Sequence, residues 1–408
     1  MSGSLDGVRV IDLTQALSGP FCTSLLADHG ADVVKVESPH GDFLRNAGPF
    51  PSGDEHQAYG GVFGSANRNK RGIVLDLKTT AAREVLLRLV DEADVLVENF
   101  SAGVMDRLGL GYRTLADRNP RLVYTSIRGF GDTVGGASPY RDWPAFDIVA
   151  QAMGGLMSIT GPDADTPVRA GSGIGDTVPG LFAAFGTMAA LREAERTGRG
   201  QYVDVAMVDS VLAVSEVVVN TYAATGTSPR PIGNQLHGFA PFDTVRAKDG
   251  TVTLGAPHRA QWTKLCAVME RPELVTDERF STDHARWVNR QAVYEIVNDW
   301  TEQRTVAELV DLLGGEVPLA PVMDAEAIFA DPHFAARDML PTVEHPGTGE
   351  PIAVTGVPVK LSATPGRVAR RAPLLGEHTE EVLHEAGFDD HAIESLCAAG
   401  AVRRGESA

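Results

Sequence analysis

The sequence predicts an α/β protein with a buried parallel sheet and a second domain. In the first 130 residues, short apolar runs rich in β-branched side chains alternate with stretches of helical spacing, which is the pattern of βαβ units. The chain has 408 residues, more than one hydrophobic core usually accommodates, so two domains are expected. Its 43% hydrophobic and 22% charged residues are typical of a soluble globular protein.

The expected elements of this first region follow one another in a regular order. Strands are expected at 8–13, 31–36, 72–77, 93–97, 122–127 and 201–207, and helices at 21–29, 81–90, 177–191 and 208–224. Parallel sheets bind their ligands beyond the carboxyl ends of the strands. Those ends fall here at 14–20, 37–42, 76–78, 99–101 and 128–131, and they are rich in Gly, Pro and polar residues.

The second region begins with a linker at 225–235, which carries two Gly and two Pro among polar residues. A hairpin turning at 248–250 and helices over 258–312 follow, and a return linker is expected at 314–321. The segment beyond it is long for a simple tail and is expected to rejoin a core. The expected domains are therefore 1–224, 225–325 and a returning segment, 326–408.

Charge and composition exclude several classes of partner. The net charge of −18 argues against nucleic acid, whose phosphates the surface would repel. No apolar run is expected to reach membrane-spanning length, and the N-terminus lacks the features of a signal peptide, so a cytoplasmic location is expected. Cys22, Cys266 and Cys397 have neither metal nor disulfide spacing, so buried free thiols and no metal site are expected.

Asp176 stands out because of the glycines in front of it. Gly171, Gly173 and Gly175 precede it at alternate positions, and the small residues of 177–191 follow. Glycines let a backbone approach another backbone or a ligand closely. Two interpretations remain open here: the carboxylate caps the helix N-terminus, or it attacks an electrophile in covalent catalysis. The two are compatible, since a capping carboxylate is held in its charged form.

Other polar patterns are less specific. The segment 67–71 (NRNKR) is the densest basic cluster of the first half, and it either binds phosphates or forms a solvated turn. The residues Glu98-Asn99-Phe100, with Arg107 shortly after, offer amide, aromatic and cationic contacts to a nucleotide. The glycine run matches neither a dinucleotide fingerprint nor a P-loop, and no G-x-S-x-G elbow is present.

Several short segments occur in a specific order along nearly the whole chain. They are 10–13 (VIDL) with 19–20 (GP), 30–37 (GADVVKVE), 69–78 (NKRGIVLDLK), 94–100 (DVLVENF), 175–176 (GD), 197–201 (TGRGQ) and 371–378 (RAPLLGEH). Each is weak alone, but their order and spacing resemble the class III coenzyme A transferase family, which includes formyl-CoA transferase and the carnitine CoA-transferases. The resemblance implies a Rossmann-like large domain, a smaller α+β domain and an interlocked homodimer.

The resemblance also implies a reaction and its residues. Asp176 would attack an acyl-CoA to give an aspartyl anhydride and then an aspartyl-CoA thioester, from which coenzyme A passes to a small carboxylic acid. No cofactor other than the coenzyme A thioester substrate is implied, and the partners would be acyl-CoA, the acid and a second copy of the chain. Coenzyme A contacts are implied by position at Leu75, Lys78, Asn99, Phe100, Arg107, Arg128 and Arg141.

Some positions depart from the family pattern. Ser38 and Leu17 replace an arginine and a glutamine of formyl-CoA transferase, and its glycine-rich tetrad loop has no clear counterpart after Gly233. The main alternative is an α-methylacyl-CoA racemase, which needs a histidine where this chain has Phe146, beside Asp147. Phenylalanine cannot exchange a proton, so the transferase is favoured. A catalytically silent CoA-binding protein is the second alternative.

Overall fold

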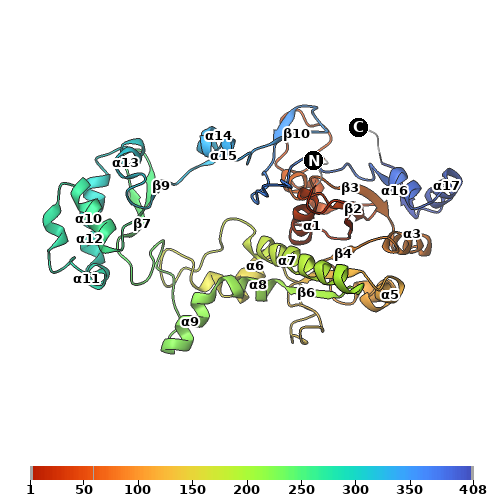
Figure 1. The fold of residues 1–408 in the computed structure, drawn as a ribbon, viewed down its shortest axis with the longest axis horizontal. Helices are drawn as coiled ribbons and strands as arrows, with labels where there is room; N and C mark the ends of the chain where they lie inside the picture. The colour runs from red at the N-terminus through yellow and green to blue at the C-terminus, as the bar shows by residue number, and fades with distance from the viewer. Residues whose placement is uncertain (1–2, 58, 406–408) are drawn as a thin grey trace. The chain divides into compact units, whose positions relative to one another are not determined.

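The computed structural model describes residues 3–57 and 59–405, and they fall into two compact units (Figure 1). The first unit runs to Met157, resumes over Arg169–Gly226 and ends with the segment from His333. The second unit consists of Ser158–Val168 and Thr227–Pro332. The sequence prediction of 225–325 for the small domain did not include the first of these two segments.

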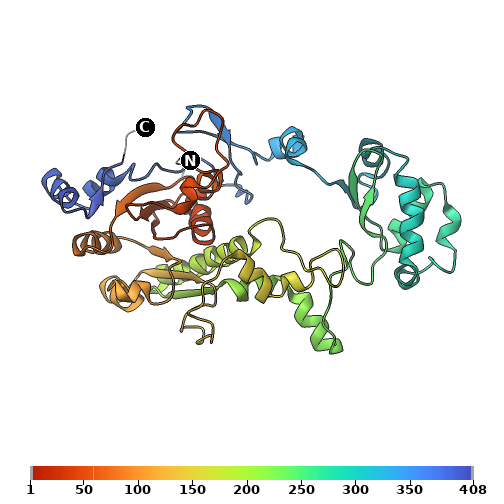
Figure 2. The same ribbon diagram turned by 180° about the vertical axis from the view of Figure 1, so that it is seen from behind.

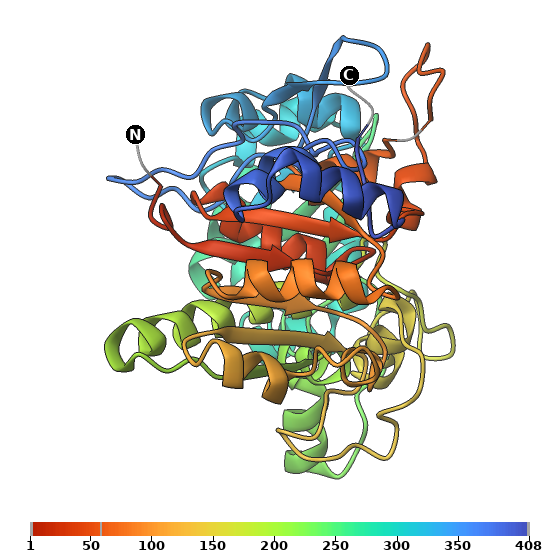
Figure 3. The ribbon, with the colours of Figure 1, turned by 90° about the vertical axis from the view of Figure 1, so that its right-hand side faces the viewer.

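The first unit is built on a seven-stranded sheet (Figure 3). Its strands are β1 (Arg9–Asp12), β2 (Asp32–Glu37), β3 (Arg71–Leu75), β4 (Val95–Glu98), β5 (Val123–Arg128), β6 (Tyr202–Ala206) and β12 (Val402–Arg403). Their order is β12-β3-β2-β1-β4-β5-β6, and all neighbouring strands are parallel except the antiparallel pair of β12 and β3. The parallel order 3-2-1-4-5-6 is that of a Rossmann fold, so the predicted parallel sheet is confirmed.

Both faces of this sheet are covered by helices, which explains why β3 and β5 are buried along their whole length. One core lies between the sheet and α3 (Thr80–Val90), α16 (Thr379–Glu385) and α17 (Asp390–Ala398). The other lies against α1 (Ser18–Asp28), α7 (Ile174–Thr197) and α8 (Met207–Val214). The C-terminal segment thus returns to the first unit, where β12 pairs with β3 (Figure 2).

The long helix α7 packs against α1, α8, β5 and β6. A Cβ atom at Gly180 would lie 2.7 Å from the carbonyl oxygen of Ser18, so the contact with α1 requires glycine at this position. By length and apolar composition alone α7 would pass for a membrane span, as would the bent pair of α8 and α9 (Glu216–Thr225), among the described residues. The prediction that no such run exists was therefore wrong, although part of α7 lies within the layer that covers the sheet.

The remaining helices and strands are mostly short. In the first unit they are α2 (Gly61–Ala66), α4 (Val104–Arg107), α5 (Tyr112–Arg118), α6 (Asp147–Met153), β10 (Thr342–Glu344) and β11 (Pro351–Ala353), with α15 (Pro332–Ala336) at its edge. The second unit has the antiparallel sheet β7 (Phe242–Arg246), β8 (Thr251–Gly255) and β9 (Leu319–Pro321) with α10 (Arg259–Val268), α11 (Asp283–Val288), α12 (Arg290–Thr301), α13 (Val306–Leu313) and α14 (Ala325–Ala330). The expected hairpin at 241–256 is confirmed as β7–β8.

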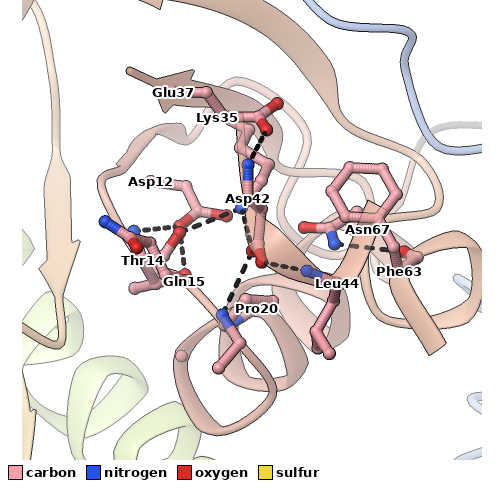
Figure 4. A network of polar contacts seen from close by, with 12 residues as sticks. Asp12, Thr14, Gln15, Pro20, Lys35, Glu37, Asp42, Leu44, Phe63 and Asn67 are labelled. Atoms are coloured by element: carbon pink, nitrogen blue, oxygen red, sulfur yellow. Dashed lines mark hydrogen bonds and ion pairs between the residues drawn. The ribbon is translucent and has the colours of Figure 1, made fainter. Parts of the chain in front are cut away.

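A buried network of charges links the carboxyl end of β1 to β2 and to the residues that precede β3 (Figure 4). Lys70 is fully buried, and its Nζ donates to Asp12 Oδ2 (2.9 Å), the carbonyl oxygen of Pro20 (2.9 Å) and Asn67 Oδ1 (2.8 Å). Lys35 Nζ, also fully buried, donates to the carbonyl oxygen of Thr14 (2.9 Å). Burial lowers the pKa of Lys70 to about 8, against the opposing charge of Asp12.

The other members of the basic cluster 67–71 are used in the same way. Arg68 is buried and forms a two-pronged ion pair with Asp28 (3.0 and 2.5 Å). Arg71 pairs with Asp32 of β2 and with Glu381 of α16. The cluster is therefore neither a phosphate site nor a solvated turn, since its cations are already neutralised by carboxylates that lie elsewhere in the sequence.

The Asp12–Lys70 pair gives a test of this network. Lys70→Met should destabilise the first unit by about 3–5 kcal/mol, because it leaves the buried charge of Asp12 without its partner. Urea unfolding followed by circular dichroism measures the change, with the exposed Lys360→Met as the matched control. A loss below about 1 kcal/mol would show that the pair does not hold the strand ends.

Candidate active site

Asp176 is the third residue of α7, not its cap. The helix starts at Ile174, and Gly173 is the N-cap residue. The carboxylate of Asp176 therefore lies in the first turn, where none of the described residues donates a hydrogen bond to it. The capping interpretation was wrong because the glycine turn enters the helix earlier than the sequence indicated.

Asp147 on α6 supplies the carboxylate at this helix start. Its Oδ1 accepts from the backbone N–H of Gly175 (2.7 Å) and from Gln151 Nε2 (2.8 Å), and its Oδ2 accepts from Arg169 Nε (2.5 Å). A Cβ atom at Gly175 would lie 2.4 Å from the carbonyl oxygen of Asp147, so only glycine permits this approach. In the sequence Asp147 is notable only as the neighbour of Phe146, because its partner at the helix start lies 28 residues away.

The electrostatic surroundings of Asp176 differ from those of an exposed carboxylate. Burial and, after it, the charge of Asp147 raise the pKa of Asp176 to about 6, against the opposing charge of Arg169. The group still loses its proton below neutral pH, so most of it is ionised at about pH 7.5. A carboxylate that is ionised yet accepts no hydrogen bond is suited to nucleophilic attack.

Asp176 lines a cavity of about 380 Å³ at the carboxyl ends of β1, β4 and β5. Neighbouring strands β1 and β4 are where the strand order reverses, which is the usual ligand site of such sheets. Among the predicted site residues, Asn99, Phe100, Arg128 and Arg141 line the same cavity. The structure thus brings these four residues together with Asp176.

Asn99 is already engaged with the loop that follows β1. Its Oδ1 accepts from the backbone N–H of Gln15 (2.8 Å), and its Nδ2 donates to the carbonyl oxygen of Gln15 (2.7 Å). The next residue, Ala16, has a φ of 63°, which is costly for a residue with a Cβ atom, and its N–H donates to Asp42. Asn99 therefore fixes the cavity wall in addition to facing the cavity.

Arg128 is also engaged. Its Nη2 donates to Glu98 (2.9 Å) and its Nη1 to Asp132 (2.6 Å), and its side chain is buried. Arg141 pairs with the same Asp132 from the other side, through Nε (3.1 Å) and Nη2 (3.0 Å). Glu98 and Asp132 therefore fix the guanidinium of Arg128 through its two terminal nitrogens, while its buried Nε has no partner among the described residues.

A second cavity of about 230 Å³ adjoins the first, since Gln15 and Phe100 line both. Leu75, the last residue of β3, and Lys78, which follows the strand, line this second cavity, and Lys78 is exposed. Ser38 lines it as well, at the position where formyl-CoA transferase has an arginine. Arg107, at the end of α4, is exposed and lines neither cavity.

The residues beside Asp176 bear on the choice between acyl transfer and proton transfer. Phe146 lines the first cavity, and no histidine is found among the described residues that line it. Leu17 lies against the glycine turn, because a Cβ atom at Gly173 would be 2.9 Å from Leu17 Cδ2 and 3.6 Å from Asp176 Oδ2. An apolar side chain thus lies beside the carboxylate, in agreement with its raised pKa.

Cysteine and metal chemistry contribute nothing visible to this site. Cys22 and Cys266 are buried free thiols and Cys397 is partly buried. Within the described part of the chain, His, Cys, Asp and Glu side chains form no group of three or more suited to a metal ion.

Together, the Rossmann strand order and a carboxylate without hydrogen-bond donors at its switch point define an α/β protein with a ligand site there. A family model described as CoA-transferase family III matches residues 5–379, so the chain belongs to this family. It is 47% identical over 385 residues to the succinyl-CoA:mesaconate CoA-transferase of Haloarcula hispanica, covering 94% of this chain and 97% of that protein.

Two further relatives extend the comparison. The chain is 38% identical to the succinyl-CoA–D-citramalate CoA-transferase of Chloroflexus aurantiacus, covering 93% of this chain and 92% of that protein. A crystal structure of a CaiB/BaiF family protein from Brucella suis superposes with a TM-score of 0.83 at 36% identity, covering 95% of this chain and all of that one. The family recognised in the sequence is therefore confirmed.

The charge of Asp147 predicts how Asp176 titrates. In the wild type, the carboxyl carbon of Asp176 should titrate near pH 6. In Asp147→Asn it should titrate at lower pH, because a neighbouring negative charge is removed and Arg169 is left unpaired. Carbon-13 NMR of protein labelled at aspartate measures this, with the resonance identified by its loss in Asp176→Asn. An unchanged or higher titration point would contradict the electrostatic account.

Proposed function

We propose that this protein transfers coenzyme A from an acyl-CoA to a carboxylic acid, with Asp176 as the nucleophile. The observation that carries the proposal is the carboxylate of Asp176, which lines a cavity at the switch point of the sheet and accepts no hydrogen bond from the described residues. Membership in CoA-transferase family III supports the reaction class. The proposal also specifies a covalent route through Asp176.

Each step of the route conserves atoms and charge. Asp176 attacks the thioester carbonyl, and the coenzyme A thiolate leaves as an aspartyl anhydride forms. The thiolate then attacks the aspartyl carbonyl, which releases the donor acid and leaves an aspartyl-CoA thioester. The acceptor carboxylate attacks this thioester and expels the thiolate, which finally attacks the acceptor carbonyl and regenerates the Asp176 carboxylate.

A carboxylate is a weak nucleophile, so the attacked carbonyl has to be polarised. Among the described residues, none accepts a hydrogen bond from the backbone N–H groups of Ser172 and Gly173, which directly precede α7. Backbone N–H groups at a helix N-terminus stabilise the negative charge that develops on a thioester oxygen. Asp147 keeps this turn in place through Gly175.

The two cavities suggest how coenzyme A is placed. Leu75 and Lys78 of the second cavity would contact the nucleotide part, with Lys78 as the exposed cation for a phosphate. The pantetheine arm would pass Gln15 and Phe100, which both cavities share, to bring the thioester to Asp176. Arg107 lines neither cavity, so it would contact coenzyme A only at the outer surface of the protein.

Succinyl-CoA is the proposed donor and a branched C5 dicarboxylic acid of the mesaconate or citramalate type the proposed acceptor. The support is the pair of relatives at 47% and 38% identity, whose names specify these substrates. The reaction needs no cofactor beyond the coenzyme A thioester itself, because the acyl group passes between carboxylates and a thiol.

A homodimer, interlocked as the family resemblance implies, is part of the proposal. Leu181, Phe185 and Met188 form an exposed apolar stripe at helical spacing along α7, and Phe185 is 74% exposed. Exposed apolar side chains continue on α8 and α9, including Leu212 and Tyr222. A contiguous apolar surface of this kind is characteristic of a protein interface.

A racemase is the second candidate, and the lining of the first cavity argues against it. Racemisation needs a group on each side of the α-carbon, and Phe146 cannot carry a proton. A silent CoA-binding protein would fit only if substitution of Asp176 left every CoA-linked activity unchanged.

The nucleophile can be tested by trapping. During turnover with succinyl-CoA, hydroxylamine should convert the activated carboxyl of Asp176 to a hydroxamate, seen by mass spectrometry on its peptide. Asp176→Asn should lose turnover while keeping its affinity for coenzyme A within about tenfold, roughly 1.4 kcal/mol. Turnover without any adduct on this peptide, or an active Asp176→Asn, would refute the covalent role.

The dimer can be tested separately. Phe185→Asp should weaken association strongly, because it places a charge in the proposed apolar interface, and sedimentation velocity should show a monomer. Val134→Asp, which changes another exposed apolar residue outside this stripe, serves as the matched control. Equal sedimentation of Phe185→Asp and the wild type as dimers would show that the stripe is not the interface.

A further inference from the structure

The first cavity contains a cation with spare hydrogen-bonding capacity. The charged residues among its described lining are Arg128, Arg141, Asp142 and Asp176. Arg128 is buried, its two terminal nitrogens are bonded to carboxylates, and its Nε, which has no partner among the described residues, is itself buried away from solvent. Arg141 is different, since its side chain is 32% exposed and only its Nε and Nη2 engage Asp132. Its Nη1 has no partner among the described residues.

The segment that carries Arg141 is held by its neighbours. The rings of Tyr140 and Trp143 pack against each other (4.6 Å between centroids) and both contact Phe130. The N–H of Arg141 donates to the carbonyl oxygen of Ser138 (3.2 Å). Asp132 fixes one edge of the guanidinium, so the opposite edge remains for a ligand in the cavity.

We propose that Arg141 binds the distal carboxylate of a dicarboxylic acyl group or acid whose other end reacts at Asp176. A guanidinium binds a carboxylate strongly and with defined geometry, because its N–H groups form a planar fork. The inference rests on the proposed CoA transfer, and it assigns the source of dicarboxylate specificity to one residue.

The alternative ligand of Arg141 is a phosphate of coenzyme A, as the sequence resemblance implied. The structure argues against it, because Arg141 lines the cavity of Asp176 and is absent from the lining of the cavity that holds Leu75 and Lys78. A phosphate bound by Arg141 would have to lie in the same cavity as the acyl group that reacts at Asp176.

The charges also permit a second carboxylate in this cavity. When the acceptor acid enters, Asp176 is bound as a thioester and is neutral, so it does not repel the acid. Asp142 also lines the cavity, but it is exposed to solvent, which weakens its repulsion. Arg141 is then the accessible cation among the described lining residues.

Equilibrium binding to the inactive Asp176→Asn protein tests the proposal. Succinyl-CoA and butyryl-CoA carry identical coenzyme A parts and four-carbon acyl chains, and they differ in the distal carboxylate. When Arg141 is present, succinyl-CoA should bind roughly 10- to 100-fold more tightly than butyryl-CoA, the range expected for hydrogen bonds to a charged group. In Arg141→Met this preference should disappear, while butyryl-CoA binding stays unchanged. Isothermal titration calorimetry measures all four affinities.

Two further variants make the result specific. Arg141→Lys keeps the charge but loses the fork, so part of the preference should remain. Arg118→Met is the matched control, because Arg118 on α5 is 40% exposed and pairs with one carboxylate, that of Asp91 after α3. The Arg118→Met variant should prefer succinyl-CoA over butyryl-CoA by the same factor as the Asp176→Asn protein without a further substitution.

Each other outcome overturns the proposal in a distinguishable way. Equal weakening of both acyl-CoAs in Arg141→Met would place coenzyme A itself on Arg141. A preference that survives in Arg141→Met would assign the distal carboxylate to another residue. If the Asp176→Asn protein binds neither acyl-CoA, the proposed function fails together with this inference.

Discussion

The arrangement of this site depends on the buried carboxylate of Asp147. It accepts hydrogen bonds from the N–H of Gly175, the amide of Gln151 and the guanidinium of Arg169, three donors near the start of α7. Asp176 is left without a donor and beside a negative charge, so its pKa rises while it stays ionised at neutral pH. A nucleophile needs this condition, because a carboxylate bound by several donors would be stabilised against attack.

The part of the cavity wall formed by the loop after β1 is held in a conformation that costs stability locally. The loop after β1 contains Ala16 at a positive φ, and Asn99 holds it through both atoms of its amide. Beneath it, Asp12 and Lys70 are removed completely from water. A buried ion pair contributes little net stability, but losing one partner is costly, so the pair fixes the position of the loop. Strain of this kind is typical of functional sites.

Much of the fold was predictable from local patterns, whereas the pairing of charges was not. Five-residue runs of β-branched side chains identified β1 to β6, but nothing local indicated that β12 completes the sheet edge. The order and spacing of several short segments identified the family, which the family model confirms. Two features could not be predicted from local sequence. The cations of the cluster at 67–71 pair with carboxylates that are distant in sequence, and the helix start that was expected at Asp176 is held by Asp147, 28 residues from Gly175.

The central claim is that coenzyme A reaches the acceptor acid through a covalent bond to Asp176, a route that leaves one oxygen of the acceptor on this aspartate. The most direct measurement is a single turnover with acceptor acid labelled with oxygen-18 in its carboxylate, followed by mass spectrometry of the peptide that contains Asp176. The route through an aspartyl anhydride and thioester predicts that this peptide gains one oxygen-18 atom, because the last step leaves one acceptor oxygen on the aspartate. Formation of the acceptor thioester without any label on Asp176 would contradict it.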